Sequence, residues 1–462
     1  MSPKPHEYLA GVIRDGLCTR CGACVGLGAG HVTVPDREGD HLPRIGASLP
    51  EDLARRIVAG CSGREVPIPE LEAAAFSGSP GADGYVGAPA PTPAPATDAA
   101  ARDPYLGRVE LLALAYSLDP DLRARGASGG ILTTVLLWLL ERGEIQGAVV
   151  TGMDPARPWR PRTYIATSPR EIIEAAQSKY VITSVNEALP EMERFEGALA
   201  YVGLPCQVHS LRKLQRAGDP AVRQVRYVLG PYCGNTLHFS SIRSLLASHG
   251  LRYYRQIESL RFREGEWPGN LRLGLRSGAT ITLPKFHANY LIPFHIVRRC
   301  LLCTDLANEL ADIAGGDAWA PAYEERGKGF SIVLGRSARG VRCLRALEAA
   351  GRLRLLPLTT AEAIRMHSHG YDLKKRGAFI RMQFRRWRGQ SVPDYGYQLG
   401  GFPLARYALE AVISALFALL GTRPARRALE CVPPTWMGRL FVRLRTLWKR
   451  GTRRIKLHEL HP

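Results

Sequence analysis

Three cysteines with regular spacing lie near the start of the chain and limit what the surrounding segment can fold into. Cys18, Cys21 and Cys24 form the pattern C-x2-C-x2-C. This spacing lets one tight loop place three thiolates at three corners of an iron-sulfur cube, a cluster that soft thiolates suit well. A zinc knuckle or three free thiols would give the same pattern. The segment is therefore interpreted as a 4Fe-4S site that needs a fourth ligand.

The fourth ligand does not follow in the next few residues. In the bacterial ferredoxin pattern a Cys-Pro pair comes after three more residues, but Gly28 and Ala29 stand there. Cys61 is the one cysteine that remains in residues 1–76, and Gly60 and Gly63 beside it would let the backbone approach a bulky group. We expect Cys61 to complete the set.

Length and composition indicate a folded, multi-domain chain. Its 462 residues suggest two or three units. Hydrophobic residues make up 45% and charged residues 23%, which excludes a largely disordered or fibrous chain. The polar opening lacks the apolar stretch of a secretory signal, so we expect a cytoplasmic location. In that reducing compartment the ten cysteines favour metal ligation or catalysis over disulfides.

The sequence divides into four parts of different character. Residues 1–76 are short and loop-rich, and residues 77–100 form a Pro/Ala/Gly tract typical of an extended linker. In residues 101–370 apolar strand-like runs alternate with amphipathic helical ones, which predicts a mixed α/β core. Residues 371–462 are helical and basic in pattern, with helices expected over Leu404–Leu420 and Met437–Arg450.

The positive charge is concentrated at the end of the chain. The formal net charge is +20, and residues 421–462 hold eleven Lys and Arg against two acids, Glu430 and Glu459. We expect this tail to dock either on an acidic electron carrier or, peripherally, on the inner anionic face of a membrane. The run Leu404–Leu420 is shorter than the roughly 20 residues that span a bilayer, so it is not predicted to cross one.

A second set of cysteines is dispersed through the α/β core. It consists of Cys206 in Gly-Leu-Pro-Cys-Gln, Cys233 in Gly-Pro-Tyr-Cys-Gly, and the pair Cys300 and Cys303 in Cys-Leu-Leu-Cys. Each alone is a weak signal, since a lone cysteine is more often a buried small hydrophobe. Their context adds weight: the segments around them, together with GASGGILTT at 126–134, ERGEIQGAVV at 141–150 and SKY at 178–180, lie in one order along residues 108–370.

In that order the segments resemble the beta-subunit family of the coenzyme F420-reducing hydrogenases and dehydrogenases. The resemblance implies FAD and a 4Fe-4S cluster bound by Cys206, Cys233, Cys300 and Cys303. With its N-terminal cysteines, the chain is similar to the two-cluster branch that includes plant hydroxymethyl chlorophyll a reductase. The fold implied is a flavin-binding α/β core with a ferredoxin-like iron-sulfur module before it and a basic helical extension after it. Cys343 and Cys431 match nothing and are expected to be buried structural thiols.

The resemblance also assigns flavin-binding residues. Ser128, Gly129 and Gly130 precede an apolar helix expected over Ile131–Leu140, and its N-terminus would cradle the FAD phosphates. Ser178, Lys179 and Tyr180 follow a helical run, and Lys179 would neutralise the pyrophosphate or act on the flavin ring. Asp312 and Asp317 would contact the flavin or hydrogen-bond around the second cluster.

The expected function is that of an iron-sulfur flavoprotein oxidoreductase. Electrons would pass between ferredoxin or coenzyme F420, as co-substrate, and a small organic acceptor, through two 4Fe-4S clusters and FAD. The alternative is a non-catalytic electron-transfer subunit that serves a partner redox subunit. A nucleic-acid binder with zinc-bound cysteines fits the charge but not the Gly-Leu-Pro-Cys-Gln segment, so no nucleic acid is expected as a partner.

Overall fold

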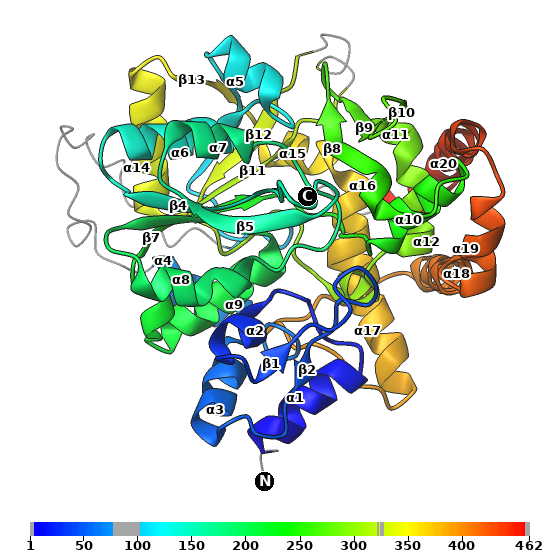
Figure 1. Ribbon diagram of the computed structural model, residues 1–462, viewed down its shortest axis with the longest axis horizontal. Coiled ribbons are helices and arrows are strands. Elements are labelled where there is room, and N and C mark those ends of the chain that lie inside the picture. The colour runs from blue at the N-terminus through cyan, green and yellow to red at the C-terminus, as the bar shows by residue number, and fades with distance from the viewer. Residues whose placement is uncertain (1–3, 77–101, 321–322, 324–327, 458–462) are drawn as a thin grey trace.

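The computed structural model describes residues 4–76, 102–320, 323 and 328–457. The tract 77–100, predicted to be an extended linker, lies outside these residues. An eight-stranded mixed sheet forms the centre of the molecule (Figure 1). Its strands are β3 (Leu111–Ser117), β4 (Gly147–Met153), β5 (Pro161–Ala166), β6 (Leu199–Val202), β7 (Val225–Pro231), β11 (Ile313–Asp317), β12 (Ser331–Gly335) and β13 (Leu353–Pro357).

The four strands β4, β6, β7 and β11 run parallel at the middle of the sheet, in the overall order β13-β3-β12-β11-β7-β6-β4-β5. The remaining strands pair antiparallel at both sides. Parallel strands are covered on both faces, which explains the continuous apolar run Gly147–Val150 from which a strand was predicted. The mixed α/β core expected from the sequence is confirmed.

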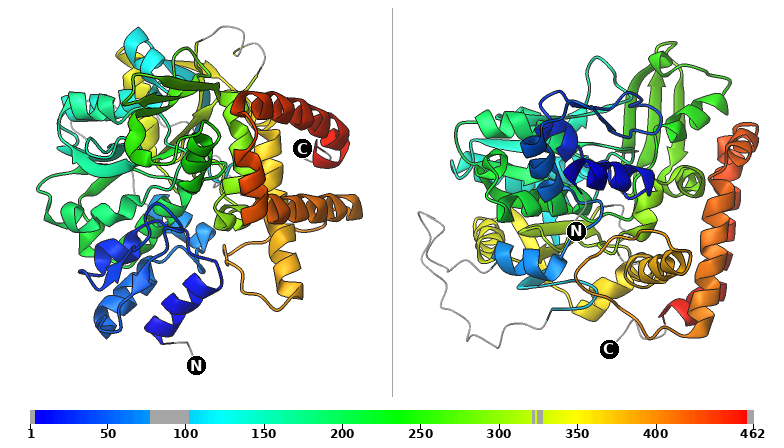
Figure 2. Two further views of the ribbon diagram at one scale, coloured as in Figure 1. Left: turned by 45° about the vertical axis from the view of Figure 1, so that its right-hand side comes forward. Right: turned by 90° about the horizontal axis from the view of Figure 1, so that it is seen from below.

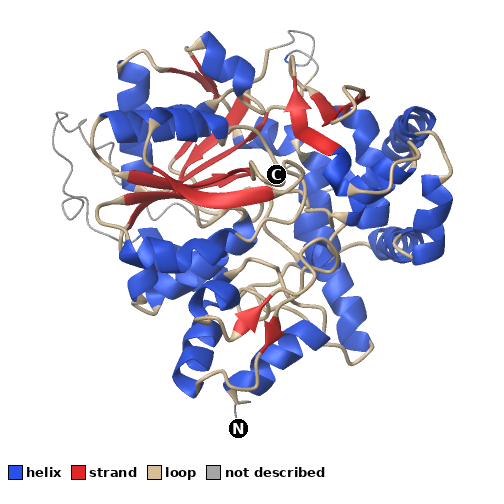
Figure 3. Cartoon of the chain, viewed as in Figure 1, coloured by secondary structure: helices blue, strands red, loops and turns tan. Residues whose placement is uncertain are grey.

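Helices cover both faces of this sheet (Figure 3). One face packs against α6 (Ile131–Glu141), α7 (Pro169–Glu174) and α14 (Ala338–Ala349), with α5 (Pro120–Arg125) beside them. The other face packs against α8 (Leu189–Arg194) and α9 (Pro205–Arg216). Residues of β4 alternate between the two cores, since Ala148 and Val150 face α6 and Val149 faces α9.

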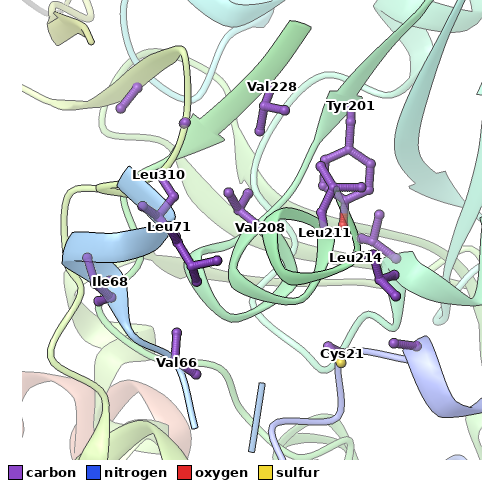
Figure 4. Packing of buried hydrophobic residues seen from close by; sticks show 14 of the residues in the cluster. Cys21, Val66, Ile68, Leu71, Tyr201, Val208, Leu211, Leu214, Val228 and Leu310 are labelled. Atoms are coloured by element: carbon purple, nitrogen blue, oxygen red, sulfur yellow. The ribbon is translucent and has the colours of Figure 1, made fainter. Parts of the chain in front are cut away.

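The N-terminal module packs directly on the α9 side. It contains α1 (Pro5–Arg14), α2 (Ala23–Leu27), β1 (Val32–Thr33), β2 (Arg44–Ile45), α3 (Glu51–Gly60) and α4 (Ile68–Phe76). Figure 4 shows Val208, Leu211 and Leu214 of α9 lying between the strand residues Tyr201 and Val228 and the module residues Leu71 and Cys21. The module therefore shares one hydrophobic core with the sheet.

A smaller three-stranded antiparallel sheet stands beside the main one. Its strands are β8 (Ile257–Glu264), β9 (Asn270–Leu275) and β10 (Thr280–Pro284). The short elements around the two sheets are η1 (Val185–Ala188), η2 (Pro220–Val222), α10 (Ser240–Ala247), η3 (Tyr254–Gln256), α11 (Lys285–Ala288), η4 (Asn289–Leu291), α12 (Ile292–His295) and η5 (Arg298–Leu302).

The C-terminal part is helical, as the sequence predicts. It contains α15 (Thr360–Met366), α16 (Ser368–Tyr371), the π-helix η6 (Asp372–Gly377), α17 (Ala378–Trp387), α18 (Leu404–Leu420), α19 (Arg423–Glu430) and α20 (Pro434–Leu457). The expected helix over Leu404–Leu420 is confirmed, and the one over Met437–Arg450 is confirmed within the longer α20. Between α17 and α18 the chain returns to the N-terminal module, where Val66 N donates to Asp394 O at 2.8 Å.

Among the described residues, no single helix is both long and apolar enough to cross a membrane. Taken together, α18 and α19 meet the length and composition of a span, but they are bent by 69°.

Candidate functional site

A cavity with a volume of about 490 Å³ opens at the carboxyl ends of the parallel strands. Thr151 of β4, Gly203 after β6, Tyr232 after β7 and Asp317 of β11 all line it. This edge of an open α/β sheet is where ligands bind, and the volume lies in the range of small-molecule and cofactor sites. We call it the carboxyl-edge cavity.

The glycine turn before α6 forms one wall of this cavity. Ser128 and Gly130 line it, and Gly130 caps the helix with φ of 76°. Gly129 lies behind them, where its N–H donates to Ser331 Oγ at 2.9 Å. A Cβ on Gly129 would stand 2.6 Å from the carbonyl oxygen of Ala115, so the turn requires glycine there. The first residues of α6 also line the cavity, which brings free helix N–H groups to it.

Ser178, Lys179 and Tyr180 also line the cavity. The helix before them, α7, ends at Glu174, and Gln177 adopts φ of 73°. The Lys179 ammonium donates to the carbonyl oxygens of Ala175, Ala176 and Gln177 at 2.5, 2.8 and 3.1 Å. Burial and the nearby Arg261 lower the pKa of Lys179 to about 7. Its donors therefore already have protein acceptors.

A buried arginine outside every predicted motif joins three of the predicted segments. Arg263 of β8 donates to Tyr180 Oη at 2.9 Å, to Asp317 Oδ1 at 3.0 Å and to the carbonyl oxygen of Ala127 at 2.5 Å. Trp267 Nε1 also donates to Asp317 Oδ1, at 3.1 Å. Burial would raise the pKa of Asp317, but the Arg263 guanidinium outweighs it and keeps that pKa below its usual range. Asp317 therefore stays ionised.

A second unpredicted cation, Lys285, begins α11 and lines the cavity. Its ammonium lies 5.3 Å from the ring centre of Trp319 and 5.4 Å from that of Tyr180. Such contacts with aromatic rings hold a cation at the cavity wall. A single lysine after a strand carries no sequence signal of this role.

The structure does not bring Asp312 to the cavity. Asp312 precedes β11 and Asp317 ends it, so the two carboxylates lie at opposite ends of the strand. Asp312 is buried, accepts from Arg212 Nη2 at 3.1 Å and from Val228 N at 2.8 Å, and forms an ion pair with Arg339. These contacts tie α9 and α14 to the sheet.

The second cysteine set surrounds a smaller cavity, which we call the core quartet. Cys206 lies at the start of α9, Cys233 follows β7, and Cys300 and Cys303 lie on and after η5. All four line the same cavity. Burial raises the pKa of Cys206, and the neighbouring thiols of Cys233 and Cys303 raise it further. Segments almost one hundred positions apart are thus gathered at one point.

The first cysteine set surrounds a third cavity, which we call the N-terminal quartet. Cys18, Cys21, Cys24 and Cys61 all line it. Cys61 directly follows α3. Gly63 lets the chain pass close to α1, since a Cβ on Gly63 would stand 2.5 Å from Val12 Cγ1. The structure therefore brings Cys61, the least constrained of the predicted ligands, to the same cavity as the other three.

Both quartets fit a group larger than one ion. Within the part of the chain that the structure describes, no three Cys, His, Asp or Glu side chains are gathered closely enough to hold a single metal ion. Tetrahedral zinc needs every sulfur within about 2.3 Å of one point, whereas an iron-sulfur cube takes each thiolate at a different iron. Four partly buried thiols around one cavity suit the cube.

The three cavities adjoin in series. The carboxyl-edge cavity and that of the core quartet share Cys233, Gln207 and Thr236 among their lining residues. The cavities of the core and N-terminal quartets share Thr19 and Arg20. The order is therefore N-terminal quartet, core quartet, carboxyl-edge cavity.

The two remaining cysteines differ from each other. Cys343 of α14 is buried in the core, as expected. Cys431 is exposed, so its predicted burial is wrong. It lies in the turn after α19, and the apolar residue of that segment that points inward is Leu429.

The fold and the site define an α/β protein with a cofactor-sized cavity at the carboxyl edge of its sheet and two partly buried cysteine quartets beside it. Family models for the coenzyme F420 hydrogenase/dehydrogenase beta subunit match residues 112–190 with the N-terminal part and residues 197–361 with the C-terminal part. Together they cover just over half of the chain. The chain belongs to the coenzyme F420 hydrogenase/dehydrogenase beta subunit family.

Individual relatives are distant. The coenzyme F420-dependent sulfite reductase of Methanocaldococcus jannaschii is 25% identical over 265 residues, which are 54% of this chain and 39% of that protein. The coenzyme F420 hydrogenase subunit beta of Methanosarcina barkeri is 27% identical over 243 residues, 52% of this chain and 78% of that protein. The chain therefore spans about two fifths of the first relative and over three quarters of the second.

A solved structure shares the fold. A chain of the F420-reducing [NiFe] hydrogenase complex from Methanosarcina barkeri superposes with a TM-score of 0.50 and 22% identity, over 63% of this chain and 98% of that chain. The likeness supports the arrangement of the central sheet.

Proposed function

We propose that this chain is a redox protein that exchanges electrons between coenzyme F420 or a ferredoxin-like carrier and a small organic acceptor, with FAD in the carboxyl-edge cavity and a 4Fe-4S cluster in each quartet. The observation that carries the proposal is the series of three adjoining cavities, two lined by four cysteines each and one of cofactor size. The named activities of the relatives supply coenzyme F420 as the candidate partner.

The residues of the carboxyl-edge cavity suit an anionic, aromatic cofactor. The turn Ser128–Gly130 and the N-terminus of α6 offer backbone N–H groups to a pyrophosphate. Lys285 adds a positive charge to the lining, and Tyr180 and Trp319 offer ring faces. Lys179, whose donors are held by three carbonyl oxygens, instead fixes the turn after α7, which leads into Ser178 and Tyr180.

When bound, a flavin exchanges one or two electrons and a 4Fe-4S cluster exchanges one, so their combination matches a one-electron carrier to a two-electron partner. The chain's own residues line the adjoining cavities that would hold these groups next to one another. Arg299 and Lys374, both buried, line the cavity of the core quartet and place fixed positive charge beside its thiolates. Gln207 and Thr236 lie at the shared wall toward the carboxyl-edge cavity.

The second candidate is a non-catalytic electron-transfer subunit. It is favoured by the relatives named as hydrogenase subunits, one of which this chain matches over 78% of its length. A partner subunit would then carry out the chemistry on the organic substrate. Coenzyme F420 reacting with the isolated chain would argue against this alternative.

The proposal is tested by measuring the iron and flavin content of the full chain, purified anaerobically, and its reaction with reduced coenzyme F420. We expect about eight irons and one FAD per chain, because each set of four cysteines encloses one cube. When reduced coenzyme F420 is mixed with this protein, the flavin absorbance should bleach. Zinc in place of iron, or intact clusters without any flavin, would refute the assignment.

A further inference from the structure

The helix α18 has its charges on the inside. Arg406 and Glu410 are its two charged residues, and both are fully buried. Arg406 Nε donates to Asp372 Oδ1 at 2.8 Å, and Arg406 Nη2 lies 2.7 Å from Glu410 Oε2. Arg381 of α17 also pairs with Glu410. The ionic face of α18 therefore packs against the molecule through a closed network.

The outward face of α18 is apolar. Leu404, Val412, Leu416 and Leu419 have exposed fractions of 87%, 54%, 45% and 65%. They repeat at intervals of three, four and eight residues, so they lie on one face. Every other exposed residue of α18 is alanine: Ala405, Ala408, Ala411, Ala415 and Ala418. The usual amphipathic pattern of a water-facing helix is thus reversed, and such a contiguous apolar face marks an interaction site.

Positive charge lies on the two helices next to α18. Helices α18, α19 and α20 lie along one side of the molecule (Figure 2), and α18 packs beside both of the others. Their exposed arginines are Arg423 and Arg427 on α19 and Arg439, Arg443, Arg450, Arg453 and Arg454 on α20. Within the described residues of α19 and α20 the one acidic residue is Glu430, which accepts from Ser244 Oγ at 2.5 Å. Trp436 at the start of α20 is 59% exposed.

Part of α20 serves the fold instead. Met437 and Phe441 pack on the core beside the three-stranded sheet, and a Cβ on Gly438 would stand 2.6 Å from His287 Cβ. The inner stripe of α20 therefore anchors the helix. Leu444 and Leu447, with exposed fractions of 55% and 63%, are left on its outer side.

We propose that the outer face of α18, with the flanking arginines of α19 and α20, binds the surface of an anionic membrane. The exposed residues of α18 are all aliphatic and offer no hydrogen bond, whereas the centre of a protein–protein interface is enriched in Tyr, Trp, Met and Arg. Acyl chains suit such a face, and arginines suit anionic headgroups. The helix lies flat in the interface, and its buried ion network keeps α18 fixed to the protein.

Vesicle flotation with the cofactor-loaded full chain tests this proposal. We expect binding to vesicles of phosphatidylglycerol and phosphatidylcholine and at least tenfold weaker binding to phosphatidylcholine alone. Leu416→Glu and Leu419→Glu should each reduce binding to the anionic vesicles at least tenfold. Leu118→Glu is the matched control, because Leu118 and Leu416 are both 45% exposed. All three variants should keep wild-type iron and flavin content, since the changed side chains face outward.

A charge variant gives an independent readout. Arg423→Gln/Arg427→Gln should weaken binding to anionic vesicles, and its difference from the wild type should shrink as salt rises. Wild-type protein that floats with neither vesicle, or Leu416→Glu protein that binds as well as the wild type, would overturn the proposal. So would a wild-type oligomer that Leu416→Glu dissociates without any vesicle binding, since the face would then be a protein interface. None of these results bears on the cofactors.

Discussion

Arg299 Nε donates to the carbonyl oxygen of Leu17 at 3.0 Å, and this bond joins the two cysteine quartets. Arg299 precedes Cys300 of the core quartet, and Leu17 precedes Cys18 of the N-terminal quartet. The same buried guanidinium donates to the carbonyl oxygen of Gly63 at 3.2 Å and to Tyr395 Oη at 3.0 Å. One side chain therefore fixes the backbone on both sides of the N-terminal quartet.

Arg299→Met should damage the N-terminal quartet more than the core quartet. The substitution leaves two buried carbonyl oxygens without their donor, at a cost of about 1–3 kcal/mol each. We expect lower thermal stability and an iron content that falls from about eight toward four per chain. Iron assays and electron paramagnetic resonance of the reduced protein separate the two clusters. Preferential loss of the core cluster would show that Arg299 holds the core quartet instead, and equal loss of both clusters would show that it serves both.

Cys61→Ser should abolish the N-terminal cluster and spare the other. Cys61 is the fourth thiol at the cavity of Cys18, Cys21 and Cys24, so its loss should lower the iron content by roughly half. Cys431→Ser is the matched control, since this exposed cysteine belongs to neither quartet. Wild-type iron and spectra in the Cys61→Ser protein would contradict the assigned ligand.

Two lysines occupy matching positions, one at each quartet. Lys374 Nζ donates to the carbonyl oxygen of Cys300 at 3.3 Å, and Lys213 Nζ donates to that of Cys61 at 2.7 Å. Positive charge beside a cluster favours its reduced form. Lys374→Met should lower the reduction potential of the core cluster, and Lys213→Met that of the N-terminal cluster, by about 60 mV for each 1.4 kcal/mol of lost interaction.

Redox titration monitored by electron paramagnetic resonance measures both potentials in each variant, and each lysine variant serves as the control for the other. A shift of the same cluster in both variants would refute the one-to-one assignment. Unchanged potentials with normal iron content would show that both lysines act on structure alone.

The sequence predicts those parts of the site that depend on local spacing. The C-x2-C-x2-C segment, the glycine turn before α6 and the boundaries of α18 follow from short patterns, and the structure bears out the helix and the turn as elements. The central sheet also follows, because its parallel strands are continuous apolar runs. In each case the pattern is local in the sequence.

Contacts between distant segments could not be predicted in the same way. Lys285 of α11 and Lys374 of η6 line the cavities, and Arg263 of β8 bonds to the lining residues Tyr180 and Asp317. None of the three belongs to a recognisable motif. The opposite error concerns Asp312, which is close to Asp317 in sequence but separated from it by the length of an extended strand. Exposure of Cys431 likewise depends on how α19 packs, which its basic sequence leaves open.

The two aspartates at the ends of β11 provide the test that separates flavin binding from folding. Asp317→Asn removes the ionic partner of Arg263 at the wall of the carboxyl-edge cavity and disturbs the link to Tyr180 and Ala127. Arg263 is buried, and removing the partner of a buried charge costs up to about 3–5 kcal/mol, less here because the Asp317 side chain is 21% exposed. We expect an FAD affinity that falls at least tenfold, measured by flavin retention on gel filtration and by reconstitution titration.

Asp312→Asn is the matched control at the other end of the same strand. Asp312 bonds to Arg212 and Val228 away from the cavity, so its loss should lower the melting temperature while the folded fraction keeps the wild-type FAD affinity. An unchanged FAD affinity in the Asp317→Asn protein would mean that the Arg263 network serves the fold alone. A loss of FAD affinity equal in both variants would mean that flavin release merely follows destabilisation of the sheet.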